Sequence, residues 1–379
     1  MKVAIVQPFL TQKGGVERVV LEMAKHYNAP IYVVDYNPET TYPDFKNFDI
    51  RKIPYPKWID FFKFLPSKAF AGLRYGFIFY FYKFKEPYDY IIAHYSPSEW
   101  LALRNKNVVW YCHSPLRDAY DLYEYRKKIN KKDSFYMKFM LSVFRFIDKK
   151  AVKKIKLIIV NSENVKKRVK KYFGRDSVVI SPCVNPANYT NNGDEKYFLY
   201  VSRFTPSKRQ DYIVEIFRAF KRMYDKNNEY KLILAGGTST NPDAVEYLNA
   251  LKDYVKDDPN IIIKTDLTDA EIKDLYSKCT AFLFAGLDED FGIVPLEAMA
   301  SGKPVISVNE GGPREYINNG NNGFLASDIS EFVHTMHDVV TNPGGMKFLG
   351  ERARETVEKH YSCEEFDKKL DKALTQFKS

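Results

Sequence analysis

Residues 285–306 read AGLDEDFGIVPLEAMASGKPVI, and they say more about the fold than any other part of the chain. An apolar run of strand length ends at Ala285, a short loop carries Glu289, and an apolar helical segment with Glu297 follows. A second apolar run begins after Ser-Gly-Lys-Pro. This order of strand, loop, helix and strand is typical of a parallel α/β sheet, whose ligands bind beyond the carboxyl ends of the strands. The two carboxylates are therefore candidate acceptors for hydrogen bonds from a hydroxyl-rich ligand.

The start of this helix is a further candidate group. Phe291, Gly292 and Ile293 lie where the first backbone N–H groups of a helix have no partner within it. Such groups favour negative charge, so they could meet an anionic or hydroxyl-rich ligand.

Short apolar runs alternate with amphipathic stretches along the whole chain, which predicts parallel sheets covered on both faces. The predicted strands of the first half are Lys2–Gln7, Ala29–Asp35, Tyr90–His94, Val108–Cys112 and Leu157–Asn161. Those of the second half are Tyr197–Ser202, Lys231–Ala235, Ile261–Lys264, Ala281–Ala285 and Pro304–Val308. Predicted helices are Val16–His26, Tyr212–Tyr224, Val245–Val255, Asp269–Lys278, Pro295–Ala300, Arg314–Asn318 and Ile329–Val340. The expected fold class is α/β, with two Rossmann-like domains facing each other across a cleft.

Length and charge agree with two domains. A chain of 379 residues predicts two or three domains, and the polar stretch Asn185–Glu195 is the best linker candidate. We therefore expect domains at residues 1–188 and 189–363. Residues 1–190 carry a charge balance of +17 and the rest −7, within a net charge of +10. The opposite signs suggest different partners, and the basic half favours an anionic surface.

Several classes of protein are disfavoured. The four cysteines lie far apart without C-x-x-C spacing, which argues against a disulfide framework or a structural zinc site and fits a reducing compartment. The apolar start Val3–Val6 is too short for the core of a signal peptide, so we expect no targeting segment. No stretch reaches the roughly 20 apolar residues that span a bilayer. A standard dinucleotide site is disfavoured because no G-x-G-x-x-G is present.

Two loops carry groups suited to phosphate. Gly14 and Gly15 open the first predicted helix, where glycine lets backbone N–H groups approach an anion. Arg203 and Lys208 follow the first strand of the second half, and two cations there could clamp a diphosphate and neutralise a leaving group. Taken alone, the glycines could equally form an ordinary turn, and the two cations could be solvated surface charges.

The string from Glu289 to Ile306 resembles the signature of the retaining family 4 glycosyltransferases of the GT-B fold. Other motifs resemble that family in the expected order along essentially the whole chain. They are the glycine loop Gly14–Glu17, the segment Ser202–Phe204 with Lys208, and the Gly-Gly-x-x-Glu turn at Gly311–Glu315. The resemblance identifies the family, but it does not identify the sugar.

The resemblance implies a role for each candidate residue. The N-terminal domain would bind the acceptor, the C-terminal domain would bind the nucleotide sugar, and a last helix within residues 364–379 would pack back on the first domain. Arg203 and Lys208 would stabilise the departing diphosphate, and Glu297 would bind the ribose. Glu289 and the backbone of Phe291, Gly292 and Ile293 would hold the donor sugar, and Gly14 and Gly15 would approach the phosphates. The cations would replace a metal ion, so no cofactor is expected.

Residues 111–121, which read YCHSPLRDAYD, are similar to a segment of a mannosyltransferase branch that acts in bacterial O-antigen assembly. This narrows the expected donor towards GDP-mannose. His113 ends a predicted buried strand, and its imidazole, neutral or charged, could bond a sugar hydroxyl or a developing charge. A lone histidine is more often structural, but within the family His113 is expected to position the sugar.

The chain departs from the family pattern at two positions. Asp290 stands where glycine is common, which adds a negative charge and creates Asp288-Glu289-Asp290. That tripeptide matches the Asp-x-Asp metal motif of a different glycosyltransferase fold, and we interpret the match as coincidental. Arg209 stands where the family commonly has glycine after Lys208, which makes the following turn uncertain.

Aromatic and basic residues interleave over Trp58–Tyr90 and again over Phe135–Lys154. Such helices lie on anionic membranes, so we expect peripheral membrane contact. The family resemblance implies in addition a glycan or polyprenyl-linked acceptor at the inner face of the cytoplasmic membrane. Two helices that face the core with solvated basic faces would give a similar pattern. Nucleic acid is not an expected partner because no helix-turn-helix, zinc-finger or RNA-sheet signature is visible.

Two alternatives to a GDP-mannose-dependent transferase stay open. One is a UDP-glucose or UDP-N-acetylglucosamine transferase, or a sugar-nucleotide epimerase, of the same fold. The other is a non-enzymatic basic protein that binds membranes or nucleic acid. The latter predicts that loss of Glu289 or Glu297 leaves function intact, whereas a transferase would lose turnover.

Overall fold

The computed structural model describes residues 1–379 except 65–67, 122, 124–134, 239–240 and 379. The chain forms two compact units, one of residues 1–182 with 367–379 and the other of residues 183–366. The boundary lies at 182/183, a few residues before the expected 188/189.

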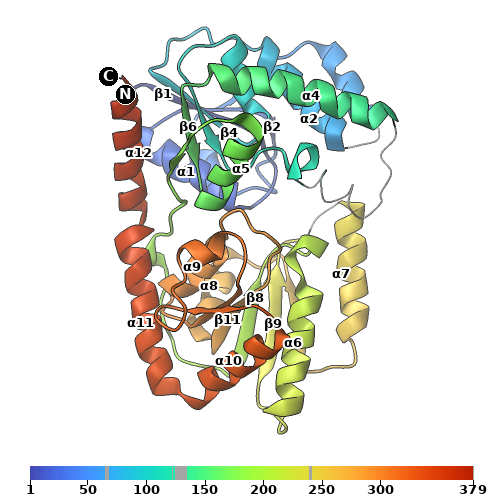
Figure 1. The fold of residues 1–379 in the computed structure, drawn as a ribbon, viewed down its shortest axis with the longest axis vertical. Helices are drawn as coiled ribbons and strands as arrows, with labels where there is room; N and C mark the ends of the chain where they lie inside the picture. Colours follow the sequence, from blue (N-terminus) through green and yellow to red (C-terminus); the bar gives the residue numbers. More distant parts are fainter. Residues whose placement is uncertain (65–67, 122, 124–134, 239–240, 379) are drawn as a thin grey trace. The chain divides into compact units, whose positions relative to one another are not determined.

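The first unit contains a parallel sheet with the order β3-β2-β1-β4-β5-β6-β7 among the described residues (Figure 1). Its strands are β1 (Val3–Leu10), β2 (Ile31–Tyr36), β3 (Ile50–Lys52), β4 (Tyr90–His94), β5 (Val108–Cys112), β6 (Leu157–Val160) and β7 (Val178–Val179). Its helices are α1 (Gly15–Tyr27), α2 (Lys68–Phe81), α4 (Phe135–Lys154), α5 (Glu163–Phe173) and the larger part of α12 (Cys363–Lys378). Short 3-10 turns are η1 (Pro43–Asn47), η2 (Lys57–Phe64), η3 (Ser98–Leu103) and η4 (Arg117–Ala119).

Helices cover both faces of this sheet. α1 and α12 lie against one face, where the Tyr90 hydroxyl donates to the carbonyl of Leu374 at 2.6 Å. α2, α4 and η3 lie against the other, around the fully buried rings of Trp100 and Phe144. The strands are apolar on both sides because both sides are buried, which is why unbroken apolar runs predicted them.

The second unit contains a parallel sheet with the order β10-β9-β8-β11-β12-β13. Its strands are β8 (Tyr197–Val201), β9 (Lys231–Gly236), β10 (Ile261–Thr265), β11 (Ala281–Phe284), β12 (Val305–Val308) and β13 (Phe324–Ala326). Its helices are α6 (Gln210–Met223), α7 (Pro242–Val255), α8 (Asp269–Lys278), α9 (Ile293–Ala300), α10 (Ile329–Thr341) and α11 (Pro343–His360). Its 3-10 turns are η5 (Pro186–Asn188), η6 (Pro206–Lys208) and η7 (Gly312–Glu315).

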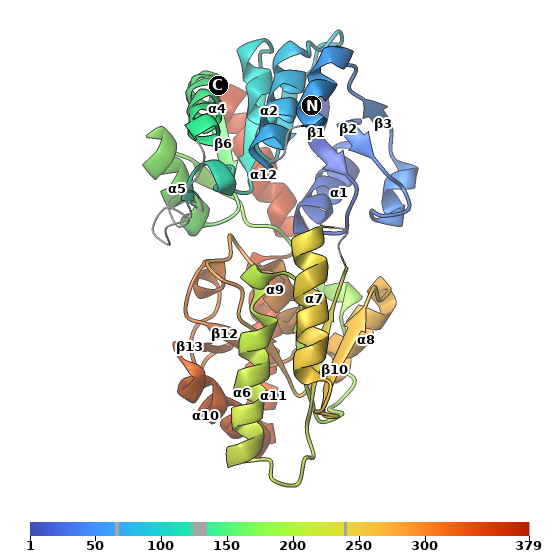
Figure 2. The ribbon, with the colours of Figure 1, turned by 90° about the vertical axis from the view of Figure 1, so that its right-hand side faces the viewer.

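Helices again cover both faces. α6 and α7 lie on one face of the second sheet, with α8 and α9 on the other (Figures 1 and 2). The predicted start of α8 is confirmed, since Thr268 and Glu271 form a reciprocal capping box. Two parallel α/β units, each Rossmann-like, confirm the expected fold class. The strands β3, β7 and β13 were not predicted, because two or three residues are too few to give a pattern.

The expectation that the cysteines form no disulfide is wrong in one respect. A disulfide joins Cys183, at the start of the second unit, to Cys363, the first residue of α12. The Val184 amide donates to the Tyr361 carbonyl at 2.9 Å, which brings the two segments together. Their separation of 180 residues hides this proximity in the sequence. Cys112 and Cys279 are free and buried.

The stretch Asn185–Glu195, predicted to be a linker, belongs to the second unit. Its polar side chains and backbone bond within that unit. The Asn192 amide donates to the Ser277 carbonyl at 2.8 Å, and the Thr280 hydroxyl donates to Asp194 at 2.6 Å. Backbone and side-chain contacts therefore fasten the stretch to α8 and to the residue that directly precedes β11.

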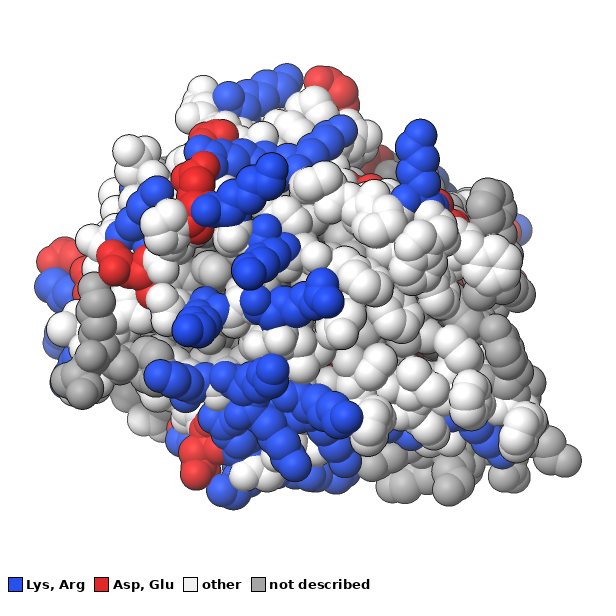
Figure 3. Space-filling model, turned by 90° about the horizontal axis from the view of Figure 1, so that it is seen from above, with Lys and Arg blue, Asp and Glu red and all other residues white. Residues whose placement is uncertain are grey.

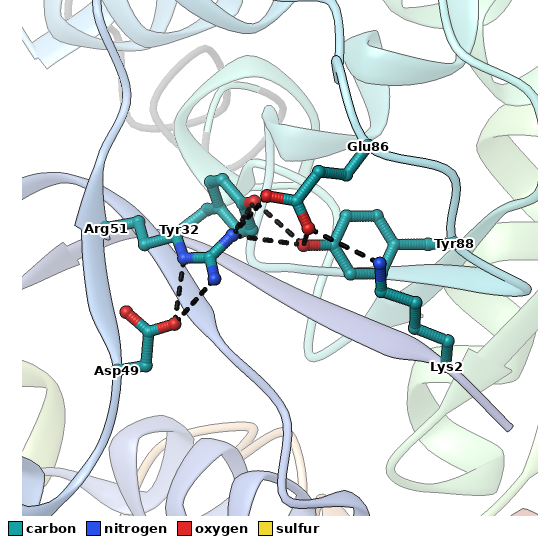
Figure 4. Close-up of polar contacts among 6 residues, drawn as sticks. All are labelled: Lys2, Tyr32, Asp49, Arg51, Glu86 and Tyr88. Carbon is teal, nitrogen blue, oxygen red and sulfur yellow. Dashed lines mark hydrogen bonds and ion pairs between the residues drawn. The ribbon is translucent and has the colours of Figure 1, made fainter.

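A polar network ties the amino ends of the first sheet together (Figure 4). The Arg51 guanidinium lies at its centre and contacts two carboxylates, each at less than 3 Å. The network comprises Lys2, Tyr32, Asp49, Arg51, Glu86 and Tyr88. Because ligands of such sheets bind at the opposite, carboxyl ends of the strands, we assign this network a structural role.

Candidate active site

Two loops meet at the carboxyl edge of the second sheet. One follows β8 and the other follows β11, and the Leu287 amide joins them by donating to the Ser207 carbonyl at 2.9 Å. The Tyr200 hydroxyl, which is buried under the sheet edge, donates to the Lys208 carbonyl at 2.5 Å. The backbone that carries Lys208 is therefore fixed from both loops.

Lys208 and Glu289, both predicted as site residues, lie in contact. Nζ of Lys208 is 2.5 Å from Oε2 of Glu289, and the side chains are 17% and 23% exposed. The pair is partly shielded from water and still accessible to a ligand. An ammonium group that can bind phosphate thus lies beside a carboxylate that can accept hydrogen bonds from sugar hydroxyls. This combination suits a nucleotide sugar.

Glycines allow the loop around Glu289 to pack tightly against the loop after β12. A Cβ atom on Gly311, whose φ is +70°, would lie 2.7 Å from the Glu289 nitrogen, and one on Gly312 would lie 2.4 Å from the Phe291 Cα. The Gly312 amide donates to the Glu289 carbonyl at 2.9 Å. The Gly-Gly turn noted in the sequence therefore supports the backbone of the candidate sugar-binding loop.

The start of α9 lies beside this loop. Gly292 precedes the helix with φ +80°, and the Tyr316 hydroxyl donates to its carbonyl at 2.6 Å. The Phe291 ring is buried and contacts the ring of Tyr316. The Phe291 side chain is thus turned into the unit, and the contact of the backbone of Phe291, Gly292 and Ile293 with a ligand stays a prediction.

Glu297 lies inside the unit. Its residue surface is 2% exposed, and its Oε2 accepts a hydrogen bond of 2.9 Å from the Tyr276 hydroxyl. Tyr276 was not predicted, because nothing local in the sequence of α8 links it to Glu297. The predicted contact of Glu297 with a ribose stays a prediction.

Arg203 is exposed on the loop after β8. Behind it, Nε2 of the buried Gln210 side chain donates to the Arg203 carbonyl and to the Ser202 hydroxyl, each at 2.9 Å. Gln210 holds the backbone while the guanidinium remains on the outside. A cation presented in this way can reach an anionic ligand at the sheet edge.

Arg209, which stands where the family commonly has glycine, lies in a turn that favours glycine. Its backbone has φ 55° and ψ 44°, the left-handed conformation that glycine adopts most easily. Its guanidinium bonds Glu310 at 2.7 Å and lies over the Tyr212 ring at 4.5 Å from the centroid. The Arg209 side chain therefore makes contacts that glycine could not make, at a backbone position where glycine would be less strained.

In the first unit, Gly14 precedes α1 and Gly15 is its first residue. The buried Glu17 carboxylate lies close by, because a Cβ atom on Gly14 would be 2.7 Å from its Oε2. The Gln12 amide donates to Oε1 of Glu17 at 3.3 Å. A carboxyl group already lies beside this glycine loop, and the contact of the loop with phosphate stays a prediction.

His113 lies just beyond the carboxyl end of β5. Asn161 donates to its carbonyl at 3.0 Å, and its Nε2 lies 3.0 Å from Nδ1 of His94. Burial lowers the pKa of His113 to about 3. Burial, and to a smaller degree His113 itself, also lowers the pKa of His94. Both rings are therefore neutral at pH 7, which selects the neutral form that the sequence left open.

The structure brings Lys208, Glu289 and the start of α9 together, and Arg203 lies on the same loop as Lys208. His113, Gly14 and Gly15 belong to the other unit, at the carboxyl edge of its own sheet. His94 was missed as a site residue, although it ends a predicted strand one strand away from His113. Parallel strands end at one edge, and that rule was the only available signal.

Two family models match the chain. The model described as Glycosyltransferase Family 4 matches residues 13–188, and the model described as Glycosyl transferases group 1 matches residues 181–356. Together they extend over nearly the whole chain and meet where the two units meet.

Several curated relatives are mannosyltransferases. The chain is 28% identical over 298 residues to the human alpha-1,3/1,6-mannosyltransferase ALG2, covering 73% of this chain and 69% of the relative. It is 26% identical over 224 residues to the Dictyostelium discoideum enzyme of the same name, covering 56% and 53%. It is 32% identical over 228 residues to the O-antigen chain mannosyltransferase RfbU of Salmonella typhimurium, covering 56% and 60%. The chain thus spans between about half and two thirds of the length of these relatives.

Solved structures show the same fold at low identity. Anabaena Alr3699/HepE in complex with UDP and glucose superposes with a TM-score of 0.73 at 16% identity, covering 99% of both chains. Sucrose-phosphate synthase of Thermosynechococcus elongatus gives 0.73 at 17% identity, covering 99% and 98%. Within the described residues no helix has the length and apolar character to cross a membrane. The two family models and the two α/β units establish that the chain belongs to the family 4 glycosyltransferases and has the GT-B fold.

Proposed function

We propose that this protein transfers mannose from GDP-mannose, with retention of configuration, to a glycan or a polyprenyl-diphosphate-linked acceptor in cell-surface polysaccharide or glycolipid assembly. The mannosyltransferase relatives support the choice of mannose, and one of them is an O-antigen chain mannosyltransferase. The observation that carries the proposal is the contact between Lys208 and Glu289 where the two loops meet.

Each candidate site residue of the second unit has one role in this proposal. Lys208 and the exposed Arg203 neutralise the diphosphate, so the leaving group needs no metal ion. The Glu289 carboxylate accepts hydrogen bonds from hydroxyls of the mannose, and the backbone N–H groups at the start of α9 donate hydrogen bonds to it. Glu297, held by Tyr276, bonds the ribose.

The reaction needs no covalent nucleophile. The bond from the sugar C1 to the phosphate oxygen breaks, and a bond from C1 to the acceptor oxygen forms on the same face. The acceptor hydroxyl gives its proton to the departing phosphate oxygen, so GDP leaves with the charge that Lys208 and Arg203 stabilise. The neutral His113 hydrogen-bonds a sugar hydroxyl and orients C1.

The test is turnover of GDP-mannose by the full chain with a polyprenyl-diphosphate-linked oligosaccharide, with EDTA present. UDP-glucose and UDP-N-acetylglucosamine serve as competing donors, and NMR of the product gives the anomeric configuration. We expect Lys208→Met and Glu289→Gln each to lower kcat/KM by about 100-fold or more. Transfer from a UDP-sugar alone, or an inverted product, contradicts the proposal.

A matched control is available at the other end of β8. Lys196 directly precedes this strand and forms a 2.7 Å ion pair with Glu229, and both side chains are about half exposed. Lys196→Met removes a Lys–Glu contact of the same kind away from the site, so it should leave turnover unchanged. Equal losses in Lys196→Met and Lys208→Met would show a general effect of charge and not a site.

We also propose that the first unit contacts an anionic membrane through α4. This helix buries Leu141 and Phe144 but leaves Phe135, Phe139 and Phe146 57–87% exposed. Its exposed lysines are Lys138, Lys149, Lys150, Lys153 and Lys154. Figure 3 looks onto this side of the unit and shows a band of Lys and Arg beside a broad uncharged area. Exposed aromatic rings next to lysines are typical of helices that lie at a membrane surface.

Co-sedimentation with vesicles tests this contact. We expect binding to phosphatidylglycerol vesicles that weakens with salt, and little binding to phosphatidylcholine. Phe139→Ser with Phe146→Ser should reduce it. Phe348→Ser, which changes an equally exposed ring on α11 of the other unit, should not. Equal binding by all these variants contradicts the assignment of α4.

A further inference from the structure

A second histidine, His94, lies in contact with His113. His94 ends β4 and lies opposite Tyr111 of β5 in the sheet register. Because Tyr111 precedes His113 by two residues, the three rings share one face of the sheet. The rings of His94 and Tyr111 stack with centroids 5.3 Å apart and an interplanar angle of 22°. His94 is fully buried, so its ring is held in place by packing.

The contact between the two imidazoles contains one hydrogen. Both rings are neutral, and Nδ1 of His94 faces Nε2 of His113 at 3.0 Å, so one nitrogen donates and the other accepts. If His94 donates, His113 must carry its own hydrogen on Nδ1. If His113 donates, its Nδ1 is a bare acceptor. The identity of the donor therefore decides what His113 can offer to a ligand.

The far side of His94 favours one arrangement. Its Nε2 is buried and has no hydrogen-bond partner among the described residues. A buried N–H group without a partner is rarer than an under-used acceptor, so Nε2 is better left without hydrogen. The hydrogen of His94 then lies on Nδ1, which faces His113.

The polar residue Gln7 lies beside His94 in the register of the sheet. Val6 of β1 pairs with Ala93 of β4, so Gln7 and His94 come next on neighbouring strands and share a face. Both amide atoms of Gln7 are buried and unpartnered among the described residues. Gln7 thus occupies the neighbouring position in the register, but its amide does not bond Nε2 of His94.

We propose that His94 is a positioning residue: its Nδ1–H donates to Nε2 of His113 and holds His113 as the Nδ1–H tautomer, which leaves a donor for a ligand oxygen. The ligand, a hydroxyl of the donor sugar, rests on the proposed function. The tautomer does not.

The first test observes the tautomer directly. The full chain is labelled with ¹⁵N-histidine, and its six histidines give two-bond ¹H–¹⁵N spectra that distinguish the tautomers. Signals of His113 are assigned by their loss in His113→Asn. We expect Nδ1 of His113 to carry the hydrogen at pH 7. A hydrogen on Nε2, or an averaged signal, overturns the proposal.

The second test removes the donor but keeps the ring. In His94→Phe the stack on Tyr111 is retained, and the His113 signals should change to those of an averaged tautomer. An unchanged His113 tautomer in this variant overturns the role of His94.

Kinetics then separate positioning from packing. In His94→Phe we expect kcat to fall about 10- to 100-fold while KM for the nucleotide sugar changes little. His94→Asn places an amide N–H near the former Nδ1 and should restore kcat to within several-fold of wild type. His337→Phe is the matched control, because His337 stacks on Tyr224 at 4.0 Å in the other unit, and it should keep wild-type kcat. Equal kcat in His94→Phe and His337→Phe overturns the positioning role.

The two failures can be told apart. If the wild-type protein transfers no sugar, the proposed function fails, and the tautomer of His113 still decides the proposal for His94. If His94→Phe does not fold, the wild-type spectrum and the kcat of His94→Asn decide it.

Discussion

Replacement of Gly236 by alanine should push the end of β9 away from the loop that follows β8 and carries Arg203 and Lys208. Gly236 is the last residue of β9, and a Cβ atom there would lie 1.8 Å from the Ser202 carbonyl oxygen. The next residue, Gly237, has no atom within 4 Å of such a Cβ. The two adjacent glycines therefore provide a variant and its control in the same loop.

The size of the effect follows from these distances. Non-bonded atoms essentially never approach a Cβ more closely than 3.0 Å, so Ser202 must retreat by at least 1.2 Å. That shift strains the hydrogen bond of 2.9 Å from the Ser202 amide to the Ala235 carbonyl. Overpacking against backbone costs about 1–3 kcal/mol, and a weakened strand bond adds about 1 kcal/mol. We expect Gly236→Ala to lower the free energy of unfolding by about 2–4 kcal/mol.

The same shift should weaken donor binding, because Arg203 directly follows Ser202 and moves with it. Urea unfolding followed by circular dichroism gives the change in stability, and calorimetric titration with GDP gives the affinity. We expect about 10-fold weaker binding in Gly236→Ala, and changes within about 0.5 kcal/mol in Gly237→Ala. If both variants unfold and bind alike, the close approach of β9 to the loop after β8 is not present in solution.

Three further outcomes follow from contacts described above. Tyr276→Phe removes the hydroxyl that bonds Glu297, so the free energy of unfolding should fall by about 1–3 kcal/mol and GDP should bind more weakly; wild-type values for both would contradict the buried pairing. Burial lowers the pKa of His113 and of its partner histidine, so the unfolded state takes up protons first as the pH falls below about 6.5. The free energy of unfolding should therefore drop towards pH 3, by up to about 1.4 kcal/mol per pH unit for each histidine. In His113→Asn, the Tm measured by thermal unfolding should change less between pH 7 and 5 than it does in the wild type. The Cys183–Cys363 bond closes a long loop, so the denatured, unreduced protein should show two reactive thiols and not four, and its reduction should destabilise the second unit by up to about 5 kcal/mol.

The strands of both sheets could be predicted because they are buried on two sides. Runs such as Tyr90–His94 and Val108–Cys112 are apolar throughout, and the structure has strands with those same bounds. A strand of two residues such as Val178–Val179 carries no such pattern, because its place in the sheet depends on its neighbours and not on its own residues.

The limits of the two units could not be predicted in the same way. Asparagine, aspartate and glycine are typical of linkers, but Asn192 and Asp194 bond Ser277 of α8 and Thr280 before β11. The same polar groups can face water or a neighbouring element, and only the fold decides between them.

The candidate site divides along similar lines. Lys208 and Glu289 were predicted because each lies in a loop directly after a strand, and parallel strands end at one edge of the sheet. His94 and Tyr276 act through a contact with a predicted residue 19 or 21 positions away, on another element. Such partnerships have no period or motif in the sequence, so the structure was needed to reveal them.

Binding of guanosine diphosphate without a metal ion is the most direct test of the proposed activity. Thermal unfolding of the full chain is recorded with GDP, UDP, ADP or CMP, each with and without EDTA. A ligand at 100 times its Kd stabilises the native state by about 2.7 kcal/mol, which raises the Tm by several degrees. We expect GDP alone to raise the Tm, equally with EDTA, and Lys208→Met to abolish the shift. A shift with UDP and not GDP, a shift that EDTA removes, or no shift with any nucleotide would contradict a metal-independent transferase that uses GDP-mannose.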